Sequence, residues 1–321
     1  MYTVKSVFEK EAREMRAVYC ETLQQLAREN DRIAVLDADL VGSSGTKPFF
    51  NEFPDRAIDC GIQENNMIGV AAGMSAAGMI PFAHSFGPFA SRRCVDQIFI
   101  SCAYAKLNVR IVGSDPGVTA AYNGGTHMPF EDMGALMSIP QITLLEPTDS
   151  VQLRWMIRQL EKEYGVYYIR MLRKNAVGVF EEGSDFELGK IARLKEGADV
   201  AIVCSGILVG EALKAAAALE AQGVSAAVLN AFTWKPLDAE TLAEYAAKCG
   251  CVVTAENHNI TGGLGAAVAE TVCESCPVPV LRVGVQDQFG RSGDPLELME
   301  YYHLTAADIA EKARQAVSMK K

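Results

Sequence analysis

The segment Asp59–Met74, with the sequence DCGIQENNMIGVAAGM, contains the features that decide the fold. An extended stretch, 56–59, runs into Gly61, and a helix is predicted to begin near Glu64. This helix is rich in glycine, which costs about 1 kcal/mol relative to alanine inside a helix. Several glycines therefore indicate close approach to another backbone. The helix dipole favours a carboxylate in the first turn, so pattern alone leaves open that Glu64 is an ordinary first-turn acid.

Composition indicates a soluble globular protein of two ordinary domains. The 321 residues are 49% hydrophobic and 22% charged. A formal net charge of -10 argues against a nucleic-acid or anionic-membrane surface, because both of these are negatively charged. No apolar run approaches the length of a membrane span, and residues 1–16 lack the apolar core of a secretory signal.

The nine cysteines are scattered along the chain. Cys273 and Cys276 have the CxxC spacing of metal and redox sites, but no second pair or histidine cluster accompanies them. Core packing is therefore the favoured role of these cysteines, and no metal site is predicted. An odd number of cysteines without a secretory segment predicts a reducing, cytoplasmic location.

Apolar runs typical of buried strands, such as 33–37, alternate with helical periodicity along the chain. Such alternation predicts parallel sheets covered by helices on both faces. It breaks over 174–190, a polar stretch that we interpret as a linker. The sequence therefore predicts two parallel-sheet α/β domains, 1–173 and 191–321. Within the first, Asp149 is predicted to cap the helix that follows it.

Gly61-Ile62-x-Glu64-x-Asn66, followed by a helix of small residues, resembles the pyrimidine-binding signature of the transketolase family of thiamine-diphosphate enzymes. The resemblance covers nearly the whole chain and implies a pyrimidine-binding domain followed by a transketolase C-terminal-type domain. In this family the glutamate hydrogen-bonds the N1′ atom of the cofactor aminopyrimidine, which promotes loss of the thiazolium C2 proton. The resemblance thus implies that Glu64 is catalytic and binds the cofactor.

Phe86-Gly-Pro-Phe89 follows a predicted strand, where most phenylalanines pack in the core. The family has a matching Phe-x-x-Phe whose rings stack on the aminopyrimidine, which implies the same role for Phe86 and Phe89. Transketolases have a tyrosine three residues further on, where this chain has Arg92. The resemblance also matches Asp39 to an acidic residue near the thiamine site, although an ordinary loop aspartate would look the same.

Gly124-Gly-Thr-His127 lies in a long glycine-rich loop, where glycine lets the backbone approach a ligand closely. An exposed loop histidine is the alternative interpretation. The family's Gly-x-Thr-His matches this stretch and implies that His127 contacts the cofactor amino group or the donor oxygen and assists proton transfer. Transketolases have an aspartate just before the motif that contacts a sugar hydroxyl. Here Asn123 keeps the hydrogen bonding but loses the charge, so the usual sugar stereochemistry is left open.

Arg16, Ser43 and Arg173 match positions that contact the acceptor phosphate in transketolases, which implies an anion-binding cluster. Arginine suits this task because its guanidinium donates two parallel hydrogen bonds to an anion. On sequence alone, each of the three is equally well an ordinary surface residue. A fourth family ligand, a histidine, has no counterpart around 113–115, so the anion is left open between phosphate, sulfonate and carboxylate.

Two further segments follow family patterns. The glycine-rich stretch 257–265 opens a predicted helix and could hold an anion, but we favour domain packing and dimer contacts. The stretch 291–294, Arg-Ser-Gly-Asp, is assigned no catalytic role.

Thiamine-diphosphate enzymes hold Mg²⁺ and the diphosphate with a Gly-Asp-Gly segment, and this chain contains none. The resemblance covers the second half of a full-length transketolase. It therefore implies the C-terminal subunit of a split enzyme, whose N-terminal partner subunit supplies the diphosphate and Mg²⁺ site. The expected assembly is a heterotetramer with two copies of each chain, and this chain alone is expected to be inactive.

The expected reaction is transfer of a two-carbon ketol unit from a ketose or ketose phosphate to an aldose or aldose phosphate. One alternative is the beta subunit of a 2-oxoacid dehydrogenase-type enzyme, and another is a non-catalytic scaffold. The joint presence of Glu64, Phe86, Phe89 and His127 argues against a scaffold. Phe-x-x-Phe together with Gly-x-Thr-His favours the transketolase, but the sequence does not name its sugars.

Overall fold

The computed structural model describes residues 1–320 and divides the chain into two compact units. The first comprises Met1–Pro116 and Ala135–Asp185, and the second comprises Gly117–Gly134 and Phe186–Lys321. Each unit is an open α/β sheet with helices packed on it, which confirms the predicted fold class. The segment 117–134 lies between strands of the first unit in sequence, but its contacts are with the second unit.

Six parallel strands form the sheet of the first unit, in the order β5-β6-β4-β3-β1-β2. Their side chains are almost entirely buried in the central strands, because helices cover both faces and leave no polar side. The strands are β1 (Ile33–Asp37), β2 (Ala57–Asp59), β3 (Ile80–Phe86), β4 (Val109–Ser114), β5 (Ile142–Leu145) and β6 (Val166–Met171).

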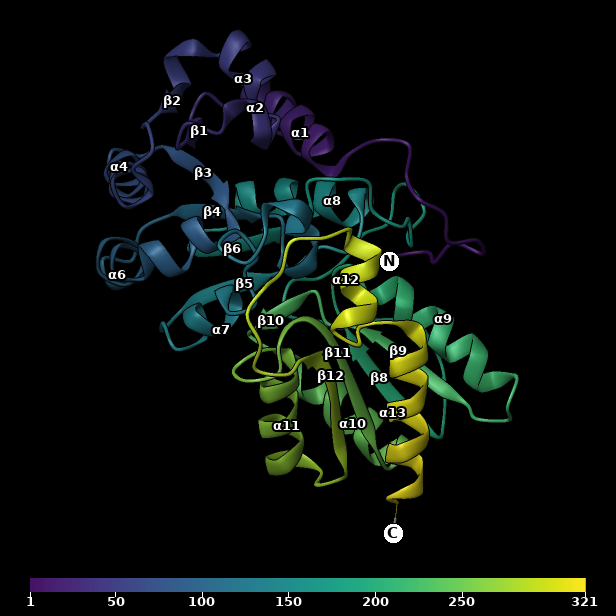
Figure 1. Ribbon diagram of the computed structural model, residues 1–321. Coiled ribbons are helices and arrows are strands. Elements are labelled where there is room, and N and C mark those ends of the chain that lie inside the picture. Colours follow the sequence, from purple (N-terminus) through teal and green to yellow (C-terminus); the bar gives the residue numbers. More distant parts are fainter. Residues whose placement is uncertain (321) are drawn as a thin grey trace. The chain divides into compact units, whose positions relative to one another are not determined.

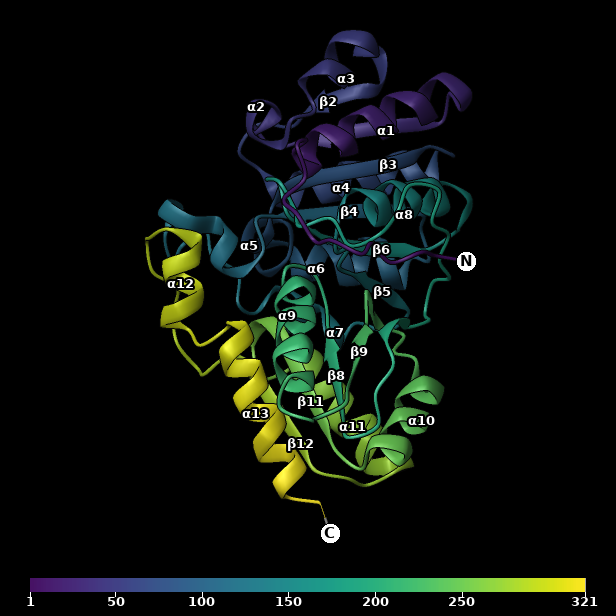
Figure 2. The same ribbon diagram turned by 90° about the vertical axis from the view of Figure 1, so that its right-hand side faces the viewer.

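The longer helices of the first unit form two groups. Helix α1 packs against α8, while α4 packs against β3 and the segment 98–104 (Figure 2). The α-helices up to α8 are α1 (Met15–Glu29), α2 (Val41–Ser44), α3 (Lys47–Glu52), α4 (Glu64–Ala76), α5 (Gly87–Ala90), α6 (Val95–Gln97), α7 (Asp132–Met137) and α8 (Ser150–Lys162). Shorter 3₁₀ segments cover Pro54–Arg56, Arg92–Cys94 and Gly117–Asn123.

The second unit contains a five-stranded sheet in the order β12-β11-β8-β9-β7. Its strands are parallel except at one edge, where β7 runs antiparallel to β9, so the expectation of a wholly parallel sheet is wrong there. The strands of this part of the chain are β7 (Ala192–Lys195), β8 (Val200–Cys204), β9 (Ala226–Asn230), β10 (Thr233–Lys235), β11 (Val252–Asn259) and β12 (Val280–Val285).

Helices α9 and α13 of the second unit pack side by side, and α10 packs against α11 (Figure 1). The bounds are α9 (Leu208–Glu220), α10 (Ala239–Cys249), α11 (Leu264–Ser275), α12 (Pro295–Tyr301) and α13 (Ala306–Ser318). Sequence periodicity did not predict α12, which is only seven residues long. Across the described chain, none of the helices has both the length and the apolar character needed to span a bilayer.

Asp149 caps helix α8 as predicted and also holds a distant segment. Its Oδ1 accepts the backbone N–H of Gln152 at 2.9 Å. Its Oδ2 accepts the backbone N–H groups of Val179 and Phe180, each at 2.8 Å. One buried carboxylate therefore accepts hydrogen bonds from the start of α8 and from the stretch that follows the first sheet, and it ties the two together.

Asp149→Ala is expected to lower the free energy of unfolding by roughly 3 kcal/mol, since it removes a cap and leaves two buried N–H groups without acceptors. Asp294→Ala is the matched control, because Asp294 caps α12 through a single, exposed N–H at 2.9 Å. That change should cost about 1 kcal/mol. Urea unfolding followed by circular dichroism measures both, and equal losses would contradict the proposed double role of Asp149.

Candidate functional site

Glu64 begins α4, immediately after the turn at Gly61, whose φ of 69° favours glycine. Its side chain is 3% exposed and lies 2.7 Å from Arg93, measured from Oε2 to Nη1. Burying a carboxylate is expensive unless a partner compensates its charge. The guanidinium of Arg93 supplies that charge, and the buried position at a helix start supports the predicted importance of Glu64.

Two aromatic rings are connected to this carboxylate through its partner Arg93. Phe86 ends β3 and Phe89 lies in α5, with ring centroids 6.3 Å apart and planes tilted by 47°. Phe86 is buried and Phe89 is partly exposed. The guanidinium of Arg93 stands 4.2 Å from the centroid of Phe89, so Glu64, Arg93 and Phe89 form one contiguous group. Aromatic faces of this kind suit stacking by a flat heteroaromatic ring.

Arg16 and Arg173 converge on Ser43, although they come from α1 and from the chain after β6. Arg16 Nη1 donates to the Ser43 carbonyl oxygen at 2.9 Å, and Arg173 Nη1 donates to the same oxygen at 3.1 Å. The structure therefore brings together all three residues predicted to bind an anion. Ser43 meets the two arginines through its carbonyl group and not through its hydroxyl group.

Each of these arginines also has an acidic partner. Arg16 Nε lies 2.6 Å from Glu14, and Arg173 Nε lies 2.7 Å from Asp115. Arg173 in addition stands over the Phe86 ring at 4.8 Å. An incoming anion would have to share these guanidinium groups with two carboxylates, because the cluster is not an unbalanced patch of positive charge.

Sequence reasoning missed Asp115 and Arg93. Asp115 follows β4 with a φ of 59°, a strained value for a residue other than glycine, and is 3% exposed. Its Oδ1 is buried without a hydrogen-bond partner among the described residues. Strain and an unsatisfied polar atom are typical of functional sites. The available signals were the position of Asp115 at a strand's carboxyl end and the adjacent Arg92-Arg93 pair.

Asp39 is exposed, with a φ of 62°, and its backbone N–H donates to Asp59 Oδ1 at 2.9 Å. The buried acid of this loop is Asp37, which accepts from the Ser44 hydroxyl at 2.7 Å. Burial raises the pKa of Asp37 to about 6, against the opposing effect of its hydrogen bonds. The structure thus gives Asp37 a local packing role and leaves the cofactor role of Asp39 a prediction.

Asn123 and His127 belong to the second unit, within the segment 117–134. The His127 N–H donates to the Gly124 carbonyl at 3.0 Å, which closes a tight turn. His127 Nδ1 lies 2.9 Å from the Thr126 hydroxyl, so the threonine of the motif orients the imidazole ring. Asn123 is exposed, and its contact with a sugar hydroxyl stays a prediction.

A buried carboxylate at a helix start, two aromatic rings and two convergent arginines on one α/β unit suit a chain that binds an aromatic cofactor and an anion. The comparisons agree with this class. Residues 11–177 match the family model of the transketolase pyrimidine-binding domain, and residues 189–309 match that of the transketolase C-terminal domain. The chain belongs to the transketolase family, whose members use thiamine diphosphate.

Individual relatives indicate which members of the family this chain resembles. The chain is 51% identical to a 6-deoxy-6-sulfo-D-fructose transketolase subunit, SqwH, of Clostridium sp. (strain MSTE9), covering 95% of each chain. It is 40% identical to a putative transketolase C-terminal section of Methanocaldococcus jannaschii, covering 93% of this chain and 94% of that protein. A solved structure described as a split gene transketolase, inactive beta4 tetramer, matches with a TM-score of 0.89 and 41% identity over 96% of this chain and 99% of that one. The chain thus corresponds to split-transketolase subunits along almost their whole length.

His84 lies in β3, two residues before Phe86, and its burial leads us to expect that the stability of the chain is sensitive to acid. It is fully buried, neither ring nitrogen has a hydrogen-bond partner among the described residues, and its ring meets Tyr19 edge-on at 5.3 Å. Burial, helped by the positive charge of Arg173, lowers the pKa of His84 to about 3. In the unfolded chain the pKa is near 6.5, so between these values only the unfolded chain binds the proton.

The free energy of unfolding should therefore fall as the pH drops from about 6.5 toward 3, by up to about 1.4 kcal/mol per pH unit from this one group. His84→Phe is expected to flatten that part of the curve, whereas replacement of the exposed His303 should not. Denaturant titrations at pH 7, 6 and 5 measure the slope, and an unchanged slope in His84→Phe would refute the assignment.

Proposed function

We propose that this chain is the C-terminal subunit of a thiamine-diphosphate-dependent transketolase that transfers a two-carbon ketol unit from an anionic ketose to an aldose. The observation that carries the proposal is the buried Glu64 carboxylate at the start of α4, whose ion-pair partner Arg93 also stands over the Phe89 ring. We infer that this carboxylate would hydrogen-bond the N1′ atom of an aminopyrimidine stacked on the aromatic rings.

A carboxylate and two aromatic rings suit the cofactor's aminopyrimidine, and we assign each residue a separate role. When bound, thiamine diphosphate supplies a nucleophilic carbon that accepts the ketol unit. Glu64 would share a proton with the N1′ atom, and Phe86 and Phe89 would fix the plane of the aminopyrimidine ring. His127 moves a proton at the donor's carbonyl oxygen, with its ring oriented by Thr126. Asn123 donates a hydrogen bond to a donor hydroxyl.

A partner subunit completes the proposed enzyme. The sequence contains no Gly-Asp-Gly segment for Mg²⁺ and the diphosphate, so we assign that site to an N-terminal subunit. The relatives named as a subunit or a C-terminal section support this division, as does a similar structure described as an inactive beta4 tetramer. We infer a heterotetramer with two copies of each chain. All nine cysteines are free, which supports a reducing, cytoplasmic location.

The donor we favour is a ketose with a terminal sulfonate, 6-deoxy-6-sulfofructose. Its support is the 51% identity to a subunit named for that sugar, whereas a subunit named for apulose 4-phosphate is 32% identical. Sulfonate and phosphate both present oxygens that Arg16 and Arg173 can bind. Phosphorylated sugars are therefore the second class of substrate, and they include the aldose that accepts the ketol unit.

Glu64→Ala in the complex with the N-terminal subunit is expected to lower ketol transfer by about 10²- to 10⁴-fold, the range that proton-transfer groups contribute. Glu21→Ala, which removes a partly exposed acid paired with Arg13, is the control and should keep full activity. The assay contains thiamine diphosphate, Mg²⁺, sulfofructose and an aldose phosphate. Full activity of Glu64→Ala would overturn the catalytic assignment, and activity on pyruvate with an artificial electron acceptor would favour the oxoacid branch.

Arg16→Ala is expected to raise the KM for a sulfonated or phosphorylated sugar by about 10- to 100-fold, since a hydrogen bond to a charged group contributes about 1.5–3 kcal/mol. The KM for erythrulose, an uncharged ketose, should stay the same because it has no anionic end. Arg13→Ala is the control, because Arg13 is an exposed arginine just before α1, and it should leave both KM values unchanged. Equal losses with charged and uncharged ketoses would show that Arg16 supports structure and does not read the anion.

A further inference from the structure

The turn that carries His127 rests on the backbone of Gly290. A Cβ atom on Gly125 would lie 2.5 Å from the Gly290 carbonyl oxygen, and one on Gly290 would lie 2.9 Å from Gly125 Cα and 2.8 Å from Met128 Cβ. Real side chains do not reach such distances, so both positions require glycine. The glycines face each other, and the close approach of Gly125 is to another part of the same unit.

Ser292 holds the other side of the same turn. Its hydroxyl donates to the Tyr122 carbonyl at 2.8 Å, and its Cβ lies 3.6 Å from the position of a Cβ on Gly124. The segment 289–294 therefore fixes the backbone on both sides of Gly124. Gly124 lies two residues before Thr126, the threonine that orients His127.

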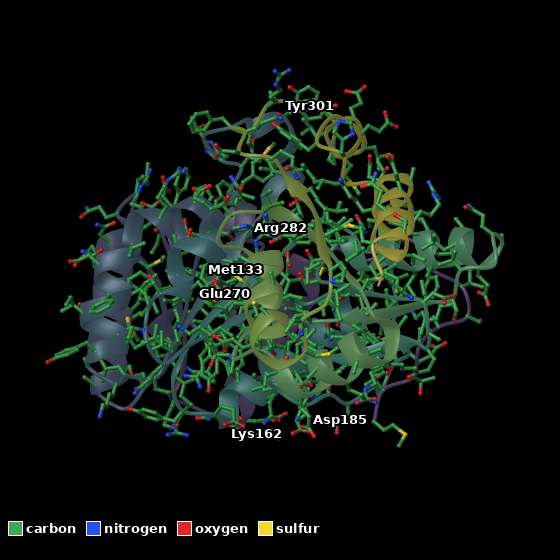
Figure 3. The ribbon with its side chains drawn as sticks, turned by 90° about the horizontal axis from the view of Figure 1, so that it is seen from below. Met133, Lys162, Asp185, Glu270, Arg282 and Tyr301 are labelled. Atoms are coloured by element: carbon green, nitrogen blue, oxygen red, sulfur yellow. The ribbon has the colours of Figure 1, made fainter. Side chains whose placement is uncertain are left out.

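Helix α12 and the residue after it fix the segment 289–294 in turn. The Tyr302 hydroxyl donates to the Phe289 carbonyl at 2.8 Å, and the Tyr302 ring meets Phe130 edge-on at 5.1 Å. The guanidinium of Arg291 stands 4.2 Å from the ring centroid of Tyr301, which projects from α12 (Figure 3). The same short element thus contacts both the segment and the far end of the loop.

The ends of the loop are anchored to β11. The Val118 N–H donates to Asn257 Oδ1 at 3.0 Å, and the Gly134 N–H donates to His258 Nε2 at 3.2 Å. The Asn259 N–H donates to the Phe130 carbonyl at 2.8 Å. Because both ends of the loop are fixed, the position of the turn depends on the contacts that Gly290 and Ser292 make with its middle.

We propose that Gly290 and Ser292 are positioning residues for His127, so that the C-terminal-type domain sets the geometry of the proton-transfer histidine. The inference rests on the proposed function for its catalytic consequence, but not for its structural part. A misplacement of about 1 Å in a reacting group can lower a rate by about 100-fold. The glycine at 290 and the hydroxyl at 292 are therefore determinants of the rate that act through the position of His127.

Gly290→Ala tests the proposal, with Gly293→Ala as its matched control in the same segment. A Cβ at 293 meets only the Leu298 side chain, at 3.3 Å, and Leu298 can adjust. Gly290→Ala is expected to lower kcat by about 10- to 100-fold while the complex still assembles, and to lower the thermal midpoint because the added Cβ displaces the backbone at Gly125. Ser292→Ala, an exposed and conservative change, should lower kcat several-fold in the same direction.

Histidine resonances provide a readout that does not need activity. The chain has four histidines, so ¹⁵N-histidine spectra of the full chain can be assigned with single His→Gln variants. Gly290→Ala should shift the His127 resonance, and Gly293→Ala should not. An unmoved His127 resonance in Gly290→Ala would overturn the inference whatever the complex does. A shifted resonance alongside a wild-type complex without ketol transfer would uphold the positioning and defeat the proposed function.

A double-mutant cycle separates positioning from general damage. In a His127→Ala background, Gly290→Ala should lower kcat by less than about twofold, because the group it positions is already gone. A loss as large as in the wild-type background would mean that Gly290 acts through stability or another residue, and the proposal would fail.

Discussion

The parallel sheet of the first unit imposes the constraint on which its site depends. Carboxyl ends of parallel strands lie at one edge, and open α/β sheets place ligands there. Strand β1 ends at Asp37, β3 at Phe86, β4 just before Asp115 and β6 two residues before Arg173. Residues that are far apart in the sequence therefore meet because their strands end together. Glu64 does not follow a strand directly. It lies in the first turn of α4, where the helix dipole stabilises its carboxylate.

Charge compensation is the second constraint, and it shapes what the site can do. Glu64 is paired with Arg93, and Asp115 is paired with Arg173. Such pairs offset the cost of burying charge, and they also mean that a ligand competes with an existing partner. On the proposed function, an anionic ligand must therefore have oxygens that fit the guanidinium groups at least as well as the carboxylates do.

Much of the fold was predictable from local patterns. Strand β1, the start of α4 and the Asp149 cap agree with the structure because apolar runs, first-turn acids and capping residues act over a few residues. The stretch 92–104 has the apolar spacing of one helix, but the structure divides it into a 3₁₀ turn, a short α-helix and a π-helical segment, Ile98–Tyr104. Its periodicity is similar in all three forms, so the pattern does not distinguish them. The partners of Glu64 and Arg173 depend on tertiary contacts, so local signals can mark Arg93 and Asp115 as candidates but do not predict which residues they pair with.

The glycines of the His127 loop show where such reasoning stops and what the structure adds. A glycine before a histidine indicates that some backbone or ligand comes close, but the sequence does not say which one. The structure identifies Gly290, more than 160 residues away, as the neighbour of Gly125. Two glycines facing each other form a contact that neither can lose alone, since a side chain on either one displaces the other's backbone. From the sequence we expected the second domain to provide domain packing and dimer contacts. The structure shows that it also holds the backbone of the His127 loop.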